Sequence, residues 1–350
     1  MIPVLVPLLC GLGLLSLSRL IGISGGAFIG AIIGGALARL LYPAAKPPPK
    51  RLQGVARILL GISIGVQVNR QTLNEIESAA VPILCMVTGI IVFSFLLAGL
   101  VSKLSGMDVT TSLCGSSPGM MTVMIMLAED LGGNVPVVAV LHTLKVFLTV
   151  GFMPLITRLV QTGEDVFAGT AGQAIPQSLT LYYGKLGFLI LAGFLLEKLL
   201  RRVKVPSSEF MAGLFIASIC NPLFLQLEIF PPLCQLAALW IIATSIGCQI
   251  TRRSLAAVRR YIFPCIALVV TQVMFGLLLG WILFHTTSMD IVTAFTGTSP
   301  IAMEAMVILS AEMRANVPLV TAMHTTRVII VMIVMPLLIR WVSAKKSRRG

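Results

Sequence analysis

The sequence predicts an all-α, polytopic membrane protein made of two inverted repeats, each with about five spanning helices plus one broken or re-entrant element. The first observation is composition: 57% of the 350 residues are hydrophobic, 11% are charged, and the mean hydropathy is +0.98. The second is a series of apolar runs close to the roughly 20 residues that a helix needs to cross a bilayer. The third is an internal duplication whose halves distribute their basic residues differently.

Each half of the chain contains six apolar segments. In the first half they lie at about 3–20, 25–42, 54–69, 79–102, 109–128 and 136–160, and in the second at about 184–200, 209–227, 232–250, 261–284, 291–310 and 318–342. The first segment lacks the basic start of a signal peptide, so we expect it to be retained as a helix. The fifth segment of each half contains a Ser-Pro dipeptide that interrupts it.

The duplication aligns each residue with the residue 182 positions later in the chain. Between 108–158 and 290–340, 19 of 51 positions are identical. The matches include the prolines and polar residues of SP, NVP and HT, which a shared apolar composition does not explain. We therefore predict a first repeat at 1–165, a linker at 166–182 and a second repeat at 183–350.

The basic residues of the loops predict that the two repeats have opposite orientations, since Lys and Arg accumulate on the cytoplasmic side. After the second segment, the first half carries five basic residues, whereas the matching stretch 221–239 has none. After the third segment, the second half carries four arginines and the first half only Arg70.

Inversion requires an odd number of crossings per repeat. That number results if the fifth segment enters and leaves on one side, which places both termini in the cytoplasm. The open alternative is that the fifth segment crosses and another, such as the short third one, does not.

The two interruptions are the candidate solute-binding site. Ser is a favoured N-cap and Pro suits the first helical position, so GSSPGMM and GTSPIAM each predict a helix that begins inside the membrane. The free N–H groups and positive dipole of such a helix start can bind an anion, and the glycine before each Ser-Pro permits irregular backbone. The alternative is a packed proline kink. The candidate substrate-binding residues here are Gly115, Ser116, Ser117, Pro118, Gly119, Gly297, Thr298, Ser299 and Pro300.

Each Ser-Pro is followed, 24 residues after its proline, by a histidine and then a cation: His142 with Lys145, and His324 with Arg327. Nine helical residues beyond Pro136, Lys145 is about 14 Å along its helix, which is close to the middle of the hydrocarbon layer. A charge at that depth is costly unless it is paired or hydrated, so these four residues join the predicted site. The alternative is a structural cation that bonds to carbonyls of the broken helix or pairs with Glu304, itself a site candidate.

Four further polar residues are candidates for a coupling ion: Asp108, Asp290, Gln67 and Gln249. The two aspartates stand directly before the broken segments, so capping a helix is the alternative we favour for them. The two glutamines stand near the ends of the third segments, where a packing hydrogen bond is the alternative role.

Several classes of protein lack support in the sequence. We find no HxH, HExxH or CxxC motif for a metal and no GxxxxGK[ST] loop for a nucleotide, so we expect no cofactor and no enzymatic activity. The net charge of +13 arises mainly from short loops, so we expect a lipid bilayer and a small-molecule solute as partners and no nucleic acid. Homo-oligomer formation is left open. The seven cysteines fit packing roles.

The duplicated block, with GSSPGMM, the turn AEDLGGNVP and its counterpart AEMRANVP, resembles the AbrB family of bacterial inner-membrane proteins over essentially the whole chain. The resemblance implies a multi-pass protein of the bacterial inner membrane. Members of this family have been labelled regulators of gene expression and ammonia monooxygenases, and the family is unrelated to the soluble DNA-binding regulator of the same name. It also resembles cation–proton antiporters and bile-acid-type symporters, whose inverted repeats contain helices broken at the midplane. The second repeat departs from the first, with Ile301 in place of Gly119 and Glu304 in place of Thr122.

These observations predict a secondary transporter of a small, anionic solute with a midplane site at two broken helices. One alternative is a membrane-embedded regulator of gene expression that senses a ligand without transporting it. Another is a cation/proton exchanger that uses Asp108, Asp290 or Glu304. Among the classes of protein, an enzyme ranks third, after a transporter and a regulator.

Overall fold

The described part of the chain is helical, with no strand, as the composition predicts. The computed structural model describes residues 2–20, 26–68, 70–118, 121–160, 179–203, 205, 207–225, 227, 230–252, 256, 261–301 and 303–347. Five of the described helices are long and apolar enough to cross a membrane: Ile2–Leu20, Ala80–Ser105, Val135–Phe152, Ser208–Leu225 and Ile262–Thr286. The chain is therefore an α-helical protein of membrane-compatible composition.

The chain divides into two compact units, and each unit takes a part from both sequence repeats. Unit 1 consists of Met1–Glu77 and Gln161–Gln249, and unit 2 consists of Ser78–Val160 and Ile250–Gly350. The first three apolar segments of each repeat thus fold together, and so do the last three. The repeats describe how the sequence was duplicated, whereas the units describe which segments bury one another.

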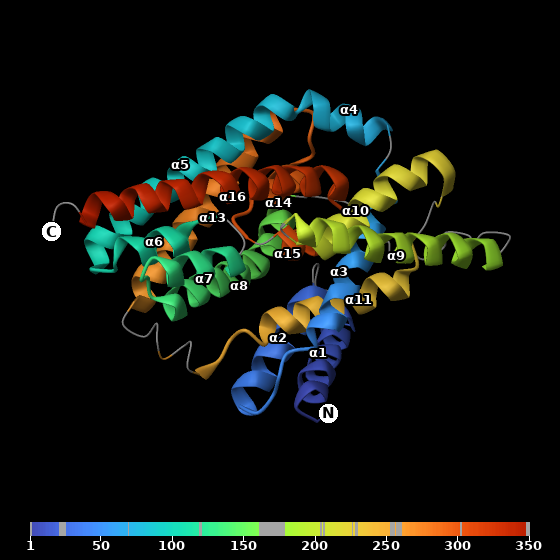
Figure 1. Ribbon diagram of the computed structural model, residues 1–350, viewed down its shortest axis with the longest axis horizontal. Helices are drawn as coiled ribbons and strands as arrows, with labels where there is room; N and C mark the ends of the chain where they lie inside the picture. The colour runs from blue at the N-terminus through green and yellow to red at the C-terminus, as the bar shows by residue number, and fades with distance from the viewer. Residues whose placement is uncertain are drawn as a thin grey trace. The chain divides into compact units, whose positions relative to one another are not determined.

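Unit 1 contains seven described α-helices and one π-helical turn. They are α1 (Ile2–Leu20), α2 (Gly26–Leu41), α3 (Lys50–Gly65), α4 (Arg70–Ser78), α9 (Leu179–Arg202), α10 (Ser208–Cys220), η1 (Asn221–Leu225) and α11 (Pro232–Gly247). Helix α2 packs against α1 and α11, and α3 packs against α10 and α11 (Figure 1). The Asn221 side chain at the start of η1 donates to Val66 O (3.1 Å) and Leu227 O (3.0 Å), which ties the end of α10 to the end of α3.

Two helix crossings in unit 1 are equivalent under the 182-residue shift, and both depend on glycine. A Cβ on Gly65, at the end of α3, would overlap the carbonyl oxygen of Leu214 in α10. A Cβ on Gly247, at the end of α11, would likewise overlap the carbonyl oxygen of Ile32 in α2. Small residues at such crossings let backbones approach closely, as in many membrane helix pairs.

Unit 2 contains two matching sets of four helices. The first set is α5 (Ala80–Ser105), α6 (Val109–Ser116), α7 (Met121–Asp130) and α8 (Val135–Val160), and the second is α13 (Ile262–Thr286), α14 (Ile291–Thr298), α15 (Met303–Glu312) and α16 (Val317–Ser347). Helices α6, α7 and the start of α8 recur 182 residues later as α14, α15 and the start of α16. The duplication found in the sequence is therefore also a structural repeat.

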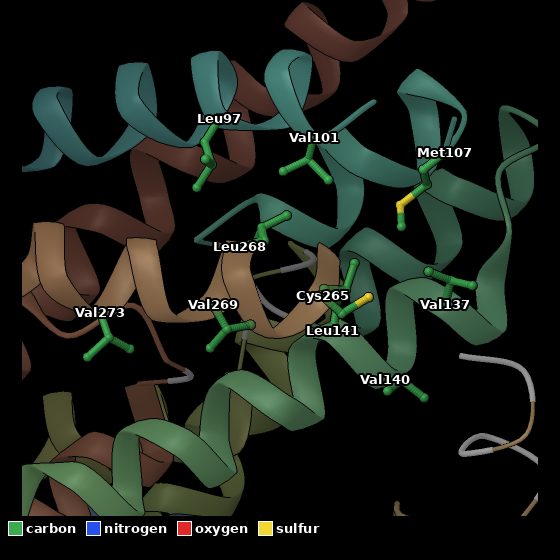
Figure 2. Close-up of a cluster of buried hydrophobic side chains, with 10 residues drawn as sticks. All are labelled: Leu97, Val101, Met107, Val137, Val140, Leu141, Cys265, Leu268, Val269 and Val273. Atoms are coloured by element: carbon green, nitrogen blue, oxygen red, sulfur yellow. The ribbon is translucent and has the colours of Figure 1, made fainter. Parts of the chain in front are cut away.

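The core of unit 2 lies where α5, α8 and α13 meet (Figure 2). It contains Leu97, Val101, Met107, Val137, Val140, Leu141, Cys265, Leu268, Val269 and Val273. The outer faces of α5 and α13 expose large apolar side chains such as Leu96, Leu100 and Leu278, which suits contact with lipid tails rather than water.

Helices α5 and α13 are repeat mates and run antiparallel. Phe93 stacks on Phe275, its own mate, with ring centroids 3.8 Å apart and planes 9° apart. Ser94, one residue later in α5, meets Gln272, three residues earlier in α13. Because the contacts advance along one helix as they retreat along the other, the two helices point in opposite directions. Two equivalent residues of the duplicated sequence are therefore in direct contact in the structure.

We expect Gly247→Ala to destabilise the protein, because the added methyl group meets backbone that cannot move aside cheaply. The expected cost is about 1–3 kcal/mol, typical of overpacking, measured as a lower melting temperature of the purified protein in detergent. Gly187→Ala in α9 is the control, since a Cβ there meets nothing within 4 Å. That change should be neutral or stabilise by roughly 0.5–1 kcal/mol through helix propensity. Equal melting temperatures for the two variants would contradict the close crossing.

The turn that ends α7 and its mate after α15 have the same backbone but different residues. Gly132 (φ 70°) and Arg314 (φ 57°) occupy equivalent left-handed positions. A non-glycine residue in this region costs roughly 1–2 kcal/mol. Arg314 is exposed, so its side chain contributes little packing there.

We therefore expect Arg314→Gly to raise the melting temperature and Gly132→Ala to lower it, each by an amount equivalent to about 1 kcal/mol. Differential scanning calorimetry in one detergent would compare both with the parent. A lower melting temperature for Arg314→Gly would show that the arginine contributes a contact that outweighs its backbone strain.

Candidate functional site

Each interrupted segment forms a helical hairpin whose two ends lie side by side. The backbone N–H of Asn134, just after α7, donates to Thr111 Oγ1 in the first turn of α6 at 2.6 Å. Asn316 N donates to Thr293 Oγ1 at 2.8 Å in the second hairpin. A chain that continued in one direction through the break would separate these groups by the combined length of both helices, about 27 Å for 18 residues at 1.5 Å each. The segment therefore returns to the end where it began.

The aspartates before the hairpins are N-caps. Asp108 accepts a hydrogen bond from Thr111 N at 2.7 Å, and Asp290 accepts one from Thr293 N at 2.9 Å. The second carboxylate oxygen of each aspartate accepts from the hydroxyl of the same threonine. The capping role that we favoured for these residues is confirmed, and both side chains have their oxygens occupied by the helix start.

The helix starts predicted at the two Ser-Pro dipeptides are wrong. Ser117 follows the last residue of α6 and is its C-cap, Pro118 is not helical, and the described part of α7 starts at Met121. Ser299 is likewise the C-cap of α14, and α15 begins at Met303. Serine in extended backbone, with ψ near 135° at both positions, fits either end of a helix, so the dipeptide alone could not distinguish them. Each break therefore presents the free carbonyl groups at the end of a helix, α6 or α14, in addition to the free N–H groups at the start of the next helix.

The glycines before the breaks also have a different role from the one expected. Gly115 and Gly297 are helical residues of α6 and α14, not part of irregular backbone. A Cβ on Gly115 would overlap the side chain of Leu141, and one on Gly297 would overlap Met323. They allow α6 and α14 to pack closely on α8 and α16.

In the first hairpin, the carbonyls freed at the end of α6 receive donors from α8. Lys145 Nζ donates to Ser117 O at 3.0 Å, and His142 Nε2 lies 3.0 Å from Cys114 O. Lys145 is 1% exposed. A cation at a helix C-terminus also interacts favourably with the helix dipole. This geometry agrees with the alternative role that the sequence left open for Lys145, a structural cation that bonds to carbonyls of the broken helix.

In the second hairpin, Arg327 bonds to carbonyl groups on both sides of the break. Its Nη1 donates to Ser299 O at 2.6 Å and its Nη2 donates to Ile301 O at 2.8 Å, so the guanidinium bridges both sides of Pro300. Nη2 also lies 2.6 Å from His324 Nδ1, while His324 Nε2 lies 3.0 Å from Thr296 O. Because the arginine can only donate, Nδ1 is the acceptor and the proton of a neutral imidazole is on Nε2.

The two breaks lie close together, because neighbouring turns of α13 touch both. Gln272 Nε2 donates to Ser116 O at 2.5 Å, and a Cβ on Gly276 would lie 3.0 Å from Thr298 O. Residues four apart in a helix are separated by about 6 Å along its axis. Lys145 and Arg327 each bond to one of these two breaks.

The predicted site residues of unit 2 are therefore largely brought together. The described members at the breaks are buried, namely Gly115, Ser116, Ser117, Pro118, Gly297, Thr298, Ser299 and Pro300, and so are His142, Lys145, His324 and Arg327. Gly119 and the side chain of Glu304 lie outside the described part of the structure.

The two glutamine candidates belong to unit 1 and are exposed. Gln67 donates to Ser63 O of its own helix at 2.9 Å, which is the local packing bond considered as its alternative role. Gln249 follows the end of α11.

Sequence reasoning missed Gln272, the residue of α13 that contacts the first break. It is 4% exposed and also donates to Ser94 Oγ at 3.2 Å. The available signal was a glutamine in the middle of an apolar helix, at a position where the first repeat has Ile90. Thr149, one turn after Lys145 on α8, is a second buried polar residue that the prediction did not include.

These features define a class: an α-helical, membrane-compatible protein with a structural duplication and two broken helical hairpins that meet around buried cations. The chain belongs to the AbrB family, since the family model described as "Transition state regulatory protein AbrB" matches residues 5–343. It is 23% identical over 340 residues to "Uncharacterized protein YhjN" of Bacillus subtilis (strain 168), which covers 91% of this chain and 87% of that protein. It is 22% identical over 303 residues to "Putative regulator AbrB" of Escherichia coli (strain K12), which covers 84% of each.

We expect Asp290→Ala to lower the stability by about 0.5–2 kcal/mol, as loss of an N-cap does, and Asp290→Asn to retain most of it because Asn also caps. Thermal unfolding of both variants, with and without sodium, distinguishes a cap from an ion ligand. An ion ligand predicts that Asn removes sodium- or proton-dependent stabilisation as completely as Ala does. Asp108→Ala and Asp108→Asn repeat the comparison in the first hairpin.

Proposed function

We propose that this protein is a secondary transporter of the bacterial inner membrane that carries a small anion bound between the two hairpin breaks. The observation that carries the proposal is that two basic side chains, Lys145 and Arg327, are buried at the two breaks, each 1% exposed. Among the described residues of unit 2, no acidic side chain is buried beside them; the one buried acid described, Glu197, belongs to unit 1. Two like charges in a medium of low dielectric repel strongly, and an anion between them relieves that repulsion.

The fold supports an inverted-repeat topology with re-entrant hairpins. If each hairpin enters and leaves the membrane on one side, α1, α2, α3, α5 and α8 remain as five crossings in the first repeat. Five crossings reverse the orientation of the second repeat, in agreement with the change of side of the basic loops. The antiparallel mates α5 and α13 agree with this arrangement. In this topology both termini are cytoplasmic and the hairpin tips meet near the midplane, where secondary transporters bind solutes.

Alternation between an inward-open and an outward-open state then requires no conformation that one of the two halves does not already have. Because the two hairpins and their supporting helices have the same backbone plan, unit 2 can present its site to either side by exchanging the conformations of its halves. The proposal includes no catalytic step, no cofactor and no nucleic-acid partner.

The second candidate function is a membrane-embedded regulator that binds a ligand without transporting it. The observation that favours it is the printed name of the Escherichia coli relative, together with the family description. A cation/proton exchanger is a weaker third, since Asp108 and Asp290 are engaged as helix caps.

A binding and flux experiment tests the proposal. Purified protein is screened by thermal shift against sodium salts of acetate, propanoate, lactate, succinate, malate and phosphate, because a ligand of the folded state raises the melting temperature. An anion that stabilises the protein is then loaded as a radiolabel into proteoliposomes. We expect saturable flux that Lys145→Gln reduces by roughly tenfold or more, the range for loss of a charged hydrogen bond.

Lys103→Gln is the matched control, since it removes the charge of an exposed lysine in the last turn of α5 and should retain flux. Binding without flux would replace the transporter with the regulator. Unchanged flux in the double variant Lys145→Gln, Arg327→Gln would refute the anion site, and stabilisation by sodium or pH alone would favour the exchanger.

A further inference from the structure

The two breaks differ in how completely their polar groups are satisfied. In the second break, Arg327 bonds to carbonyls on both sides of the proline, and Ser299 Oγ donates to Phe295 O at 2.9 Å. In the first break, Lys145 donates one hydrogen bond among the described residues, to Ser117 O, although an ammonium has three N–H groups. Ser117 Oγ is fully buried and has no partner in the described structure. Both breaks therefore keep buried groups without a described partner: Arg327 Nε at the second break, and the Ser117 hydroxyl and the remaining N–H groups of Lys145 at the first.

Gln272 adds an unused acceptor at the first break. Its amide orientation is determined by chemistry, because Ser116 O can only accept and the group that faces it at 2.5 Å must be the NH₂. The oxygen Oε1 therefore points elsewhere, is buried, and has no partner among the described residues. A buried acceptor without a donor is unfavourable, so such a group indicates either a cost accepted for another purpose or a missing partner.

The unused groups surround two consecutive residues. Gln272 is held on the carbonyl of Ser116, and Lys145 is held on the carbonyl of Ser117. Consecutive Cα atoms are about 3.8 Å apart, so Gln272 and Lys145 are anchored at neighbouring points of the same break. Thr149 Oγ1, another buried group without a described partner, is one turn beyond Lys145 on the same face of α8.

The chemistry of this set is mixed. The ammonium of Lys145 and the hydroxyl of Ser117 can donate to a carboxylate, whereas Gln272 Oε1 can only accept. A simple carboxylate such as propanoate would satisfy the donors and leave the glutamine oxygen unpaired. An acid with a hydroxyl or amino group next to its carboxylate would satisfy both.

We propose that the solute is a 2-hydroxy or 2-amino carboxylate, and that Gln272 Oε1 at the first break selects it by accepting a hydrogen bond from its hydroxyl or amino group. This inference rests on the anion site proposed above and assigns it to one break. A buried polar group discriminates strongly against a ligand that leaves it unpaired. The second break, by contrast, contributes the Arg327 side chain.

The test uses matched acids that differ only at the second carbon: propanoate, lactate and alanine, and likewise succinate, malate and aspartate. Dissociation constants for the purified full-length protein are measured by isothermal titration calorimetry. We expect the hydroxy or amino member of at least one set to bind roughly tenfold or more tightly than the unsubstituted member, as one additional buried hydrogen bond permits. Gln272→Met should bring that ratio close to one.

Two further variants separate recognition from structural damage. Thr271→Ala, one residue away on the exposed face of α13, should leave every constant unchanged. Ser117→Ala should weaken all members of a set alike and preserve the ratio. Unsubstituted acids that bind as tightly as their substituted partners to the parent protein would overturn this inference and leave the anion site standing. No binding by any of the six acids would overturn this inference, and no stabilisation by any anion of the thermal-shift screen would overturn the anion site as well. A preserved ratio in Gln272→Met would refute the role of the glutamine.

Discussion

The carbonyl groups freed by the two helix breaks, which are buried inside unit 2, are the constraint on which that unit depends. A buried polar group without a hydrogen-bond partner costs several kcal/mol. The solution is the same in both hairpins: a histidine and a cation 28 residues later return to the end of the short helix. For these donors to reach the carbonyl groups, the long helix (α8 or α16) must lie alongside the short helix (α6 or α14) from its first turn. The bond from Asn134 N to Thr111 Oγ1 and its counterpart in the second hairpin fix that start.

The same bonds make a binding function chemically reasonable. The carbonyl of Ser117 holds the Lys145 ammonium at the break, so the residue that satisfies the broken helix is also a hydrogen-bond donor that an anion could use. Arginine and lysine are not equivalent in this role. The planar fork of Arg327 reaches two carbonyls and a histidine at once, whereas the ammonium of Lys145 retains donors for another group. The repeats thus share a backbone plan and differ in what they leave available.

Much of this arrangement could be predicted from the sequence, because it depends on short motifs and their spacing. The Ser-Pro dipeptides, the His-x-x-Lys and His-x-x-Arg spacings and the 182-residue duplication located the hairpins and their cations. Whether each serine begins the helix after it or ends the helix before it was not predictable, because a serine in extended backbone fits both positions equally well. The interleaving of the repeats into two units, and the contact between Gln272 and Ser116, depend on pairings between distant segments. Such pairings leave no periodic signal within either segment.

The asymmetry between the repeats has a physical reason if the site must be both exchanged and specific. The proposed exchange of conformations needs two halves of similar structure, and the antiparallel mates α5 and α13, with Phe93 stacked on Phe275, agree with that requirement. A site with the same side chains in both halves would offer only donors, because both breaks need cations to satisfy their carbonyls. Replacement of Ile90 by Gln272 at the equivalent position of the second repeat introduces an acceptor without disturbing either cation. Selectivity can therefore reside in a residue outside the hairpins, on a helix that contacts both of them.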